Sequence, residues 1–556
     1  MMTPRLSRRS LVPWSFAAAA VLGACNLHNE GVSPPEAALS YPIAVALSRE
    51  PSPQAPRFLY VANSNFDLRY NAGSVHTYDL NKLDELLGKY MCRTLDEDVQ
   101  LSDAGTRFVP DNTRYLDASI DAGAPDAGSL DGGMSLPDGG VAFVDAGVVD
   151  AGGAVADAGM GGIALSPDYA APTEYGNKRG SLCDGRDSEA YARCCFSTRT
   201  DEEAQSVGDR GLDQIRASSH RIDSFATGVA LSPSGNRLYV PISSRARLIY
   251  LDVGEGQLDC ATSGRCTRGP GVDRGDDDPD NDFPGQPTAI ATGTLGDLGL
   301  VEPQSGLTPD TPIIITAHTR GSISVFVEKN GVPVLEHVLK GFPQRPSSVT
   351  IDSRTKLVYA TFEREAFISR IALRLDLEAY AKEQQPRELL YETSRIALTG
   401  IAQPRDLRDL AIDPNDPTRL YALIRGTQQS VAFLQVDPSA PANTEARVID
   451  AVRVGAGPSK LDLITMGGRS FLLVSCYDAK MIYIIDVASR EAVAFVRNLS
   501  GPHEVAFDAA RGLLHVSDFR ASVLRVVDLS GLVDERKPPP RIVATLGSPQ
   551  FEGGLE

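Results

Sequence analysis

The chain lacks features that mark several common functional classes. It has no excess of positive charge, because 54 Lys and Arg residues face 72 Asp and Glu residues, for a formal net charge of −18. Binding to nucleic-acid phosphates or to anionic lipid needs clustered cations, so this balance argues against both. Nor does any segment approach the ~20 consecutive apolar residues that cross a bilayer. We therefore expect no nucleic-acid partner and no spanning helix.

Familiar catalytic motifs are also missing. The sequence contains no Gly-x-Ser-x-Gly, no His-Glu-x-x-His and no Walker loop. Gly254-Glu255-Gly256 lacks the third glycine of a dinucleotide fingerprint, and the acidic run at 276–282 lacks the turn glycine of a calcium loop. We predict no catalytic residue, no cofactor and no bound metal, and favour a non-enzymatic role while leaving an enzymatic one open.

What is present begins with an export signal. Arg5, Arg8 and Arg9 precede an apolar run from Leu11 to Val21, too short to span a membrane. The run ends in Leu22-Gly23-Ala24-Cys25, which resembles a lipobox, with small residues before a cysteine that would accept lipid. This predicts a lipoprotein signal peptide at 1–24, lipidation of Cys25 and a tether over 25–40. The paired arginines leave Sec and twin-arginine export both open.

The residue after the lipidated cysteine suggests the destination. Asn26 stands where an Asp would resemble the inner-membrane retention signal of bacterial lipoproteins. We therefore expect a lipid-anchored protein in the cell envelope of a Gram-negative-type bacterium, in the outer membrane. Exposure to the periplasm or to the cell surface stays open.

A low-complexity tract interrupts the chain between about 93 and 180. Asp-Ala-Gly recurs in it, beginning at Asp103, Asp121, Asp126, Asp145, Asp150 and Asp157. Such a tract has few branched or aromatic side chains to bury, which predicts disorder. A calcium-binding β-roll is the alternative, but its nine-residue period is missing. We assign 81–223 to an insertion that contains this tract.

The remainder is a repeat of short strands. Gly228-Val229-Ala230-Leu231-Ser232-Pro233 leads to Arg237-Leu238-Tyr239-Val240 and then to Leu248-Ile249-Tyr250-Leu251-Asp252. About seven copies follow this order at a period of roughly 40–60 residues, as expected for radial repetition. We predict an all-β fold, an approximately seven-bladed β-propeller. Its first blade would occupy 41–80 and its remaining blades 224–556, with the insertion after the first blade.

These repeats resemble the YVTN-type β-propeller family of exported bacterial proteins. The resemblance rests on Leu59-Tyr60-Val61-Ala62-Asn63, on the stretch from Ser232 to Val240, and on looser later copies. It implies the propeller fold more than a function, because propellers host many roles. The only tryptophan is Trp14, inside the predicted signal, which counts against WD-type repeats and quinone-cofactor propellers.

The eight cysteines suit an oxidising compartment. Besides Cys25, we expect two bridges among Cys92, Cys183, Cys194 and Cys195, a small-loop bridge between Cys260 and Cys266, and a buried thiol at Cys476. The pairing among the first four is open. Zinc is the alternative for those four, but no Cys-x-x-Cys pair is present.

Two functions fit this sequence. The first is a monomeric, lipid-anchored ligand- or protein-binding scaffold; the alternative is a lactonase-like propeller hydrolase or isomerase that uses polar residues at the channel mouth. In a propeller, turns that lead into first strands and turns that join second to third strands share one face. Cations at these turns could form a positive funnel for a small anionic ligand: Arg345, Arg405, Lys460, His503, His318, Arg320, Arg425 and Arg520. Alternatively, each pairs with a neighbour such as Asp406, Glu504 or Asp518 to pin its turn.

Overall fold

The computed structural model describes the following residues of the chain: 34, 38–50, 55–68, 70, 72–88, 212–259, 271–272, 285–342, 345–378, 389–399, 406–437, 445–534 and 537–548. They belong to the larger of two compact units, which comprises 1–93 and 192–556. The signal peptide, Cys25, the Asp-Ala-Gly tract, the acidic run and the six cysteines expected in disulfides lie outside the described residues.

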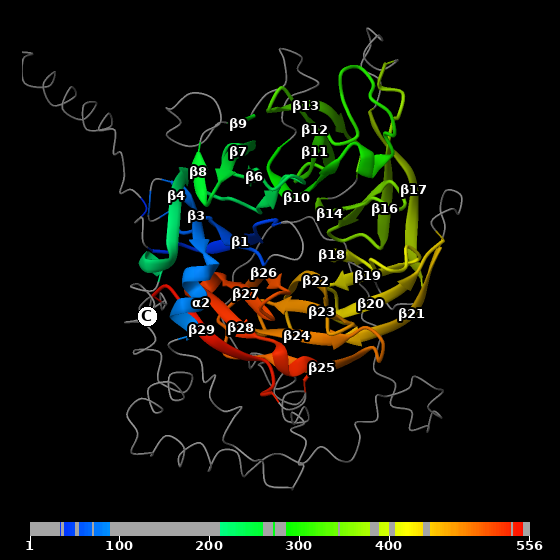
Figure 1. Ribbon diagram of the computed structural model, residues 1–556. Coiled ribbons are helices and arrows are strands. Elements are labelled where there is room, and N and C mark those ends of the chain that lie inside the picture. Colours follow the sequence, from blue (N-terminus) through cyan, green and yellow to red (C-terminus); the bar gives the residue numbers. More distant parts are fainter. Residues whose placement is uncertain are drawn as a thin grey trace, which may run out of the picture. The chain divides into compact units, whose positions relative to one another are not determined.

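The fold is all-β, as predicted, and its strands form seven antiparallel runs that we call sheet units 1 to 7 (Figure 1). Units 1 to 3 contain β1 (Pro42–Leu47), β2 (Phe58–Asn63), β3 (Gly73–Asp79) and β4 (Arg216–Ile222); β5 (Ala230–Leu231), β6 (Arg237–Ile242), β7 (Arg247–Gly254), β8 (Gln257–Asp259) and β9 (Gly271–Val272); and β10 (Pro287–Thr294), β11 (Pro312–His318), β12 (Ser322–Lys329) and β13 (Val332–Leu339).

Units 4 to 7 repeat the same order: β14 (Pro346–Asp352), β15 (Leu357–Phe362), β16 (Phe367–Leu373) and β17 (Leu390–Thr399); β18 (Leu407–Ile412), β19 (Arg419–Ile424), β20 (Ser430–Gln435) and β21 (Glu445–Arg453); β22 (Pro458–Met466), β23 (Arg469–Cys476), β24 (Met481–Asp486) and β25 (Glu491–Val496); and β26 (Pro502–Asp508), β27 (Leu513–Asp518), β28 (Val523–Asp528) and β29 (Arg541–Leu546). A short parallel pairing of β17 with β21 joins units 4 and 5 into one eight-stranded sheet. The short helical segments are α2 (Leu80–Gly88), η2 (Gly296–Leu298), η3 (Phe519–Ala521) and η4 (Ser530–Leu532).

The second strand of each unit carries the repeat that the sequence displays. Every residue of β2, β6 and β27 is buried, because these strands have packed sheets on both faces. The fourth strands are less buried: β17 has buried residues at alternate positions towards its end, and in β4 and β29 only the last residue is buried. Full burial of a Val, Leu or Ile side chain stabilises the fold by about 1.5–3 kcal/mol, which is why the apolar repeat specifies the inner strands.

Within the described residues, hydrophobic clusters join each unit to the next. Units 1 and 2, 2 and 3, 3 and 4, 4 and 5, 5 and 6, and 6 and 7 each share one cluster. A seventh cluster joins unit 7 back to unit 1, where Leu59 and Val45 pack with Leu513 and Leu524. The first strands from β5 to β26 also contact one another in succession, and β1 contacts β26. The series of packed units is therefore closed.

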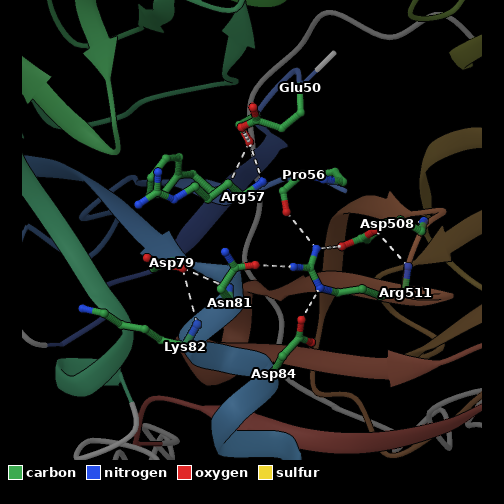
Figure 2. Close-up of polar contacts among 12 residues, drawn as sticks. Glu50, Pro56, Arg57, Asp79, Asn81, Lys82, Asp84, Asp508 and Arg511 are labelled. Carbon is green, nitrogen blue, oxygen red and sulfur yellow. Dashed lines mark hydrogen bonds and ion pairs between the residues drawn. The ribbon is translucent and has the colours of Figure 1, made fainter. Parts of the chain in front are cut away.

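A polar clasp strengthens the contact between the first and last units (Figure 2). The guanidinium of Arg511, in the turn after β26, donates to Asp84 Oδ2 at 2.6 Å, to the Pro56 carbonyl at 2.7 Å and to Asn81 Oδ1 at 2.9 Å. It also pairs with Asp508 Oδ2 at 2.7 Å, in its own unit. One side chain thus bonds segments more than 400 residues apart in sequence.

The aspartates that end many repeat strands hold turns. Asp486 Oδ1 accepts the backbone N–H groups of Ala488 and Ser489 at 2.9 and 2.8 Å, and Asp528 Oδ1 accepts that of Ser530 at 2.9 Å. An Asp carboxylate that bonds the backbone two or three residues ahead closes a turn that the peptide groups alone would leave unsatisfied. The recurrent aspartate in the sequence pattern is therefore a structural residue.

The insertion differs from its predicted position. It lies within unit 1, between β3 and β4, because Gly73–Tyr78 pairs with Arg216–Ile222. The predicted range of 81–223 therefore takes in a helix, α2, and a strand, β4, that belong with the first unit. The sequence Arg-Ala-Ser-Ser-His-Arg-Ile gave little sign of a strand because an outer strand packs on few apolar neighbours, and only its last residue is buried. Among the described helices, none has the length and apolarity needed to cross a membrane.

Candidate functional site

Six rings from four sheet units converge on one place, five of them from loops and the sixth, His503, from the start of β26. Phe519 lies with its ring centroid 5.2 Å from Tyr41, 5.8 Å from Phe66 and 6.3 Å from Tyr477, and Phe66 lies 5.9 Å from Phe225. His503 joins the group at 6.1 Å from Phe519. We call Tyr41, Phe66, Phe225, Tyr477 and Phe519 the aromatic cluster. The ring contacts bring together turns that lead into first strands and turns that join second to third strands.

The backbone holds two of these rings in a conformation that bulky residues rarely adopt. Tyr41 and Phe225 have φ values of 52° and 63°, in the left-handed region, at a cost of about 1–3 kcal/mol each. Ser64 bonds both: its N–H donates to the Tyr41 carbonyl at 2.9 Å, and its carbonyl accepts the N–H of Phe225 at 2.7 Å. Such strain persists only where surrounding bonds impose it, and it is concentrated at functional surfaces.

The loop after β2 presents apolar side chains to solvent. Phe66 is 58% exposed and Leu68 is 60% exposed. The loop is held from beneath by Asn65, whose Nδ2 donates to the Tyr70 carbonyl at 2.7 Å and whose Oδ1 accepts the Tyr70 N–H at 3.1 Å. Because the loop is bonded in place, its exposed ring is a preformed contact surface.

Beside the aromatic cluster lies a set of charged side chains on three adjacent first strands, which we call the inner charged cluster: Asp409 on β18, Lys460 and Asp462 on β22, and Glu504 on β26. Asp409 is fixed by two backbone donors, because its Oδ1 accepts the N–H of Leu410 at 2.9 Å and its Oδ2 that of Leu461 at 3.0 Å. Lys460 and Glu504 make no ion pair with any residue that the structure describes. Their charges interact at longer range.

Burial and proximity shift the pKa values of this cluster. Burial, reinforced by the charges of Asp409 and Asp462, raises the pKa of Glu504 to about 7 although Lys460 opposes it. Burial also raises the pKa of Asp462 to about 6, with Asp409 adding to the effect. Burial lowers the pKa of Lys460, but the charges of Glu504 and Asp409 outweigh it and leave that pKa raised. The carboxyl groups of Glu504 and Asp462 therefore titrate near neutral pH, beside the positively charged amine of Lys460.

His503 links the two clusters. Its Nδ1 lies 2.9 Å from the Ile43 carbonyl, to which it donates. Burial and then the charge of Lys460 lower the pKa of His503 to about 4, so the ring is neutral at physiological pH. In that tautomer Nε2 carries a lone pair. The ring thus offers an acceptor at the boundary between aromatic and charged side chains.

The structure brings together only some of the cations predicted to form a funnel. Lys460 and His503 lie together, but three carboxyl groups accompany them and His503 is neutral, so a positive funnel does not form there. His318 is fully buried, its Nδ1 bonding the Gly285 carbonyl at 3.1 Å and its Nε2 the Thr316 hydroxyl at 2.8 Å. Its side chain is therefore enclosed by the protein, and its role in ligand binding stays a prediction.

The remaining cations are dispersed. Arg425 Nη2 lies 3.6 Å from Asp478 Oδ2, and Arg345 and Arg520 are exposed on separate turns. Arg320 lines a cavity with Arg245. Arg405 lies outside the described residues. The expected buried thiol is confirmed at Cys476, where burial raises the pKa to about 12.

Sequence reasoning missed most of this site. Glu504 entered it only as a neighbour that would pin His503, while Asp409, Asp462 and the aromatic cluster were not singled out. A signal exists for the charged cluster: Asp409, Lys460, Asp462 and Glu504 interrupt first strands whose other copies carry Ala, Ser or Val at their centres. The described residues contain no group of three or more His, Cys, Asp and Glu side chains placed to hold a metal ion.

Comparisons with known proteins identify no family for this chain. No protein-family profile matches it, and no curated protein matches it. Among solved structures it is similar to a protein from Bacteroides uniformis ATCC 8492 described as a candidate 6-phosphogluconolactonase, with a TM-score of 0.35 and 15% sequence identity, over 49% of this chain and 69% of the other. A likeness at this level supports no statement about function.

Proposed function

We propose that the chain is a seven-bladed β-propeller of the YVTN type, anchored to the envelope by lipid, that binds a small polar ligand at the inner charged cluster and the aromatic cluster. The propeller assignment is supported by the seven sheet units, each packed on the next, and by the seventh hydrophobic cluster between units 7 and 1. Closure of this kind protects the edges of the small sheets.

One observation carries the binding role: charged groups with shifted pKa values lie on three adjacent first strands without a structural ion pair to occupy them. Burying such groups costs free energy, and perturbed groups of this kind gather at binding and catalytic sites. The neighbouring rings would contact an apolar face of the ligand. Donors and acceptors on the inner charged cluster would bind its polar groups.

A second candidate function is hydrolysis or isomerisation at the same residues. It is favoured by Glu504, whose pKa of about 7 suits a general acid or base at neutral pH, next to neutral His503. Binding and catalysis differ in one observable, which is whether the bound compound is converted. Binding remains the main proposal because the inner charged cluster contains no Ser, Thr or Cys side chain.

A thermal-shift screen tests the proposal with defined compounds: amino acids, monosaccharides, carboxylic acids and polyamines. We expect at least one compound to raise Tm of the purified protein, and Glu504→Gln and Lys460→Met to abolish that rise. Glu491→Gln, an exposed carboxylate on outer strand β25, is the matched control and should keep it. A compound that still raises the Tm of both Glu504→Gln and Lys460→Met would overturn the assigned site. Conversion of the hit, followed by chromatography, would favour the enzyme.

The lipid anchor has a separate test. Labelled palmitate should be incorporated by the native chain and lost in Cys25→Ser, and fractionation should move the variant out of the outer-membrane fraction. Unchanged labelling of the variant would end the anchor proposal, whatever the outcome of the ligand screen.

A further inference from the structure

A cavity lies away from the inner charged cluster, between turns of units 2 and 3. It has a volume of about 530 Å³ and shares no lining residue with the two clusters. Its walls come from three segments: the turn between β6 and β7, the residues before β10, and the turn between β11 and β12. The side chains that line it are Ser243, Ser244, Arg245, Gln286, Thr319 and Arg320.

Hydrogen bonds fix these three segments. The Thr319 N–H donates to the Gln286 carbonyl at 2.8 Å, which ties the third segment to the second. The Ser244 hydroxyl donates to the Ser224 carbonyl at 2.6 Å, and the N–H of Ala246 donates to the Ser243 carbonyl at 3.4 Å. The backbone of the three cavity segments is therefore held in place by hydrogen bonds.

Gly285 allows Arg320 to lie against the wall. Its φ is 130°, in a region that favours glycine. A Cβ at this position would stand 3.2 Å from Arg320 Cγ and 3.4 Å from both Arg320 Cδ and Thr319 Oγ1. The stem of Arg320 thus packs on the space that the missing side chain leaves. Replacing Gly285 would displace the arginine.

Among the described residues at the cavity, arginines outnumber the carboxylates that pair with them. Asp223 is shared by two arginines, with Arg245 Nε 3.5 Å from its Oδ1 and Arg247 Nη1 3.2 Å from its Oδ2. Arg247 Nε is buried without a hydrogen-bond partner. Arg320 makes no ion pair with any residue that the structure describes. Asp223 therefore pairs with both Arg245 and Arg247, and Arg320 pairs with no described carboxylate.

We propose that this cavity is an anion-binding site for a small organic molecule that carries a carboxylate or phosphate group. Arg245 and Arg320 approach from different segments, and the planar guanidinium bonds both oxygens of such a group at once. The hydroxyls of Ser243 and Thr319 supply further donors. The volume leaves room for the organic part of the ligand. The site is independent of the proposed ligand site at the inner charged cluster.

Isothermal titration of the purified protein with glycerol phosphate, succinate and uncharged glycerol tests the proposal. We expect one or both anions to bind, glycerol not to bind, and affinity to fall with added salt. Arg320→Met and Arg245→Met should each weaken binding about tenfold or more, the loss expected for a charge-assisted hydrogen bond. Gly285→Ala should weaken it too. The matched control is Arg419→Met, which changes an exposed arginine that pairs with Asp416 away from the cavity. This variant should bind the anion as the native chain does.

Several results would overturn the site. These are no binding of either anion, binding undiminished in both arginine variants, or loss of binding that follows a loss of folding in Arg320→Met as judged by its Tm. A further arm addresses Asp280 and Asp282, which precede Gly285 closely in sequence. Binding that appears only when both are changed to Asn would overturn the proposal by showing that the chain neutralises its own arginines.

Discussion

Two groups of charged residues lie close together in the last sheet units, and they differ in how their charges are compensated. Asp518 is fully buried, and its oxygens accept the N–H of Ser500 at 2.9 Å, that of Gly501 at 2.7 Å and Arg525 Nε at 3.1 Å. Glu504, on the preceding strand, has no ion pair among the described residues, and its pKa is raised to about 7. The first arrangement stabilises the fold, whereas the second leaves a charged group available to a ligand.

The number of donors that a buried carboxyl group accepts separates structural groups from candidate functional ones. A carboxylate that accepts several donors is a structural element, because removing any partner would leave the others unsatisfied. A carboxyl group such as Glu504, whose pKa is raised by burial and which has no ion pair with the nearby lysine, forms no such network of donors. The same distinction separates the Arg511 clasp from Arg320, which has no ion-pair partner among the described residues and whose stem packs on Gly285.

Removing the satisfied carboxylate should have the largest effect. Asp518→Ala leaves Arg525 as an uncompensated buried charge and two N–H groups without an acceptor, so we expect the free energy of unfolding to fall by about 3–5 kcal/mol. Chemical denaturation monitored by fluorescence or circular dichroism measures it. A loss of less than about 1 kcal/mol would show that Asp518 is not a structural carboxylate.

The clasp between the first and last units should come next. Arg511→Met keeps the length of the side chain but leaves Asp508 and the Pro56 carbonyl without their donor, and we expect a loss of about 2–3 kcal/mol. Hydrogen exchange should report faster opening of β1 and β26 than of β14. Uniform exchange across all units would contradict a role in closing the ring of units.

Glu504→Gln should have a smaller effect that depends on pH. Because the pKa of Glu504 is raised in the folded state, its favourable contribution is present below the unfolded pKa of about 4.5 and is lost as pH rises through about 7. Relative to the native chain, the variant should therefore gain about 1–2 kcal/mol between pH 5 and pH 8. Denaturation at both pH values gives the difference.

Phe66→Ala should change stability least. The side chain is 58% exposed, so the free energy of unfolding should move by less than about 1 kcal/mol. Binding of any ligand that the Glu504 variant loses should nevertheless weaken, because the ring faces that ligand in the proposed site. Equal binding by Phe66→Ala and the native chain would restrict the site to the inner charged cluster.

The sequence alone was sufficient for the all-β fold and for the order of the inner strands. Those strands are buried on both faces, so their apolar repeats are required locally, and aspartates such as Asp486 close turns that follow repeat strands. It also located Cys476 in a buried strand. Outer strand β4 could not be recognised, because its seven residues are mostly polar and its partner β3 lies more than 130 residues earlier.

The candidate site was decided by tertiary structure. Asp409, Lys460 and Glu504 come from three different copies of the repeat, and each is an ordinary charged residue in its own strand. Only packing of successive units places them together, and only that burial shifts their pKa values. Likewise, the aromatic cluster joins Tyr41 and Phe519, which are far apart in sequence and adjacent because unit 7 packs on unit 1. The local apolar pattern determines the strands. The proximity of the charged groups and of the aromatic rings depends on the packing of sheet units that are far apart in the sequence.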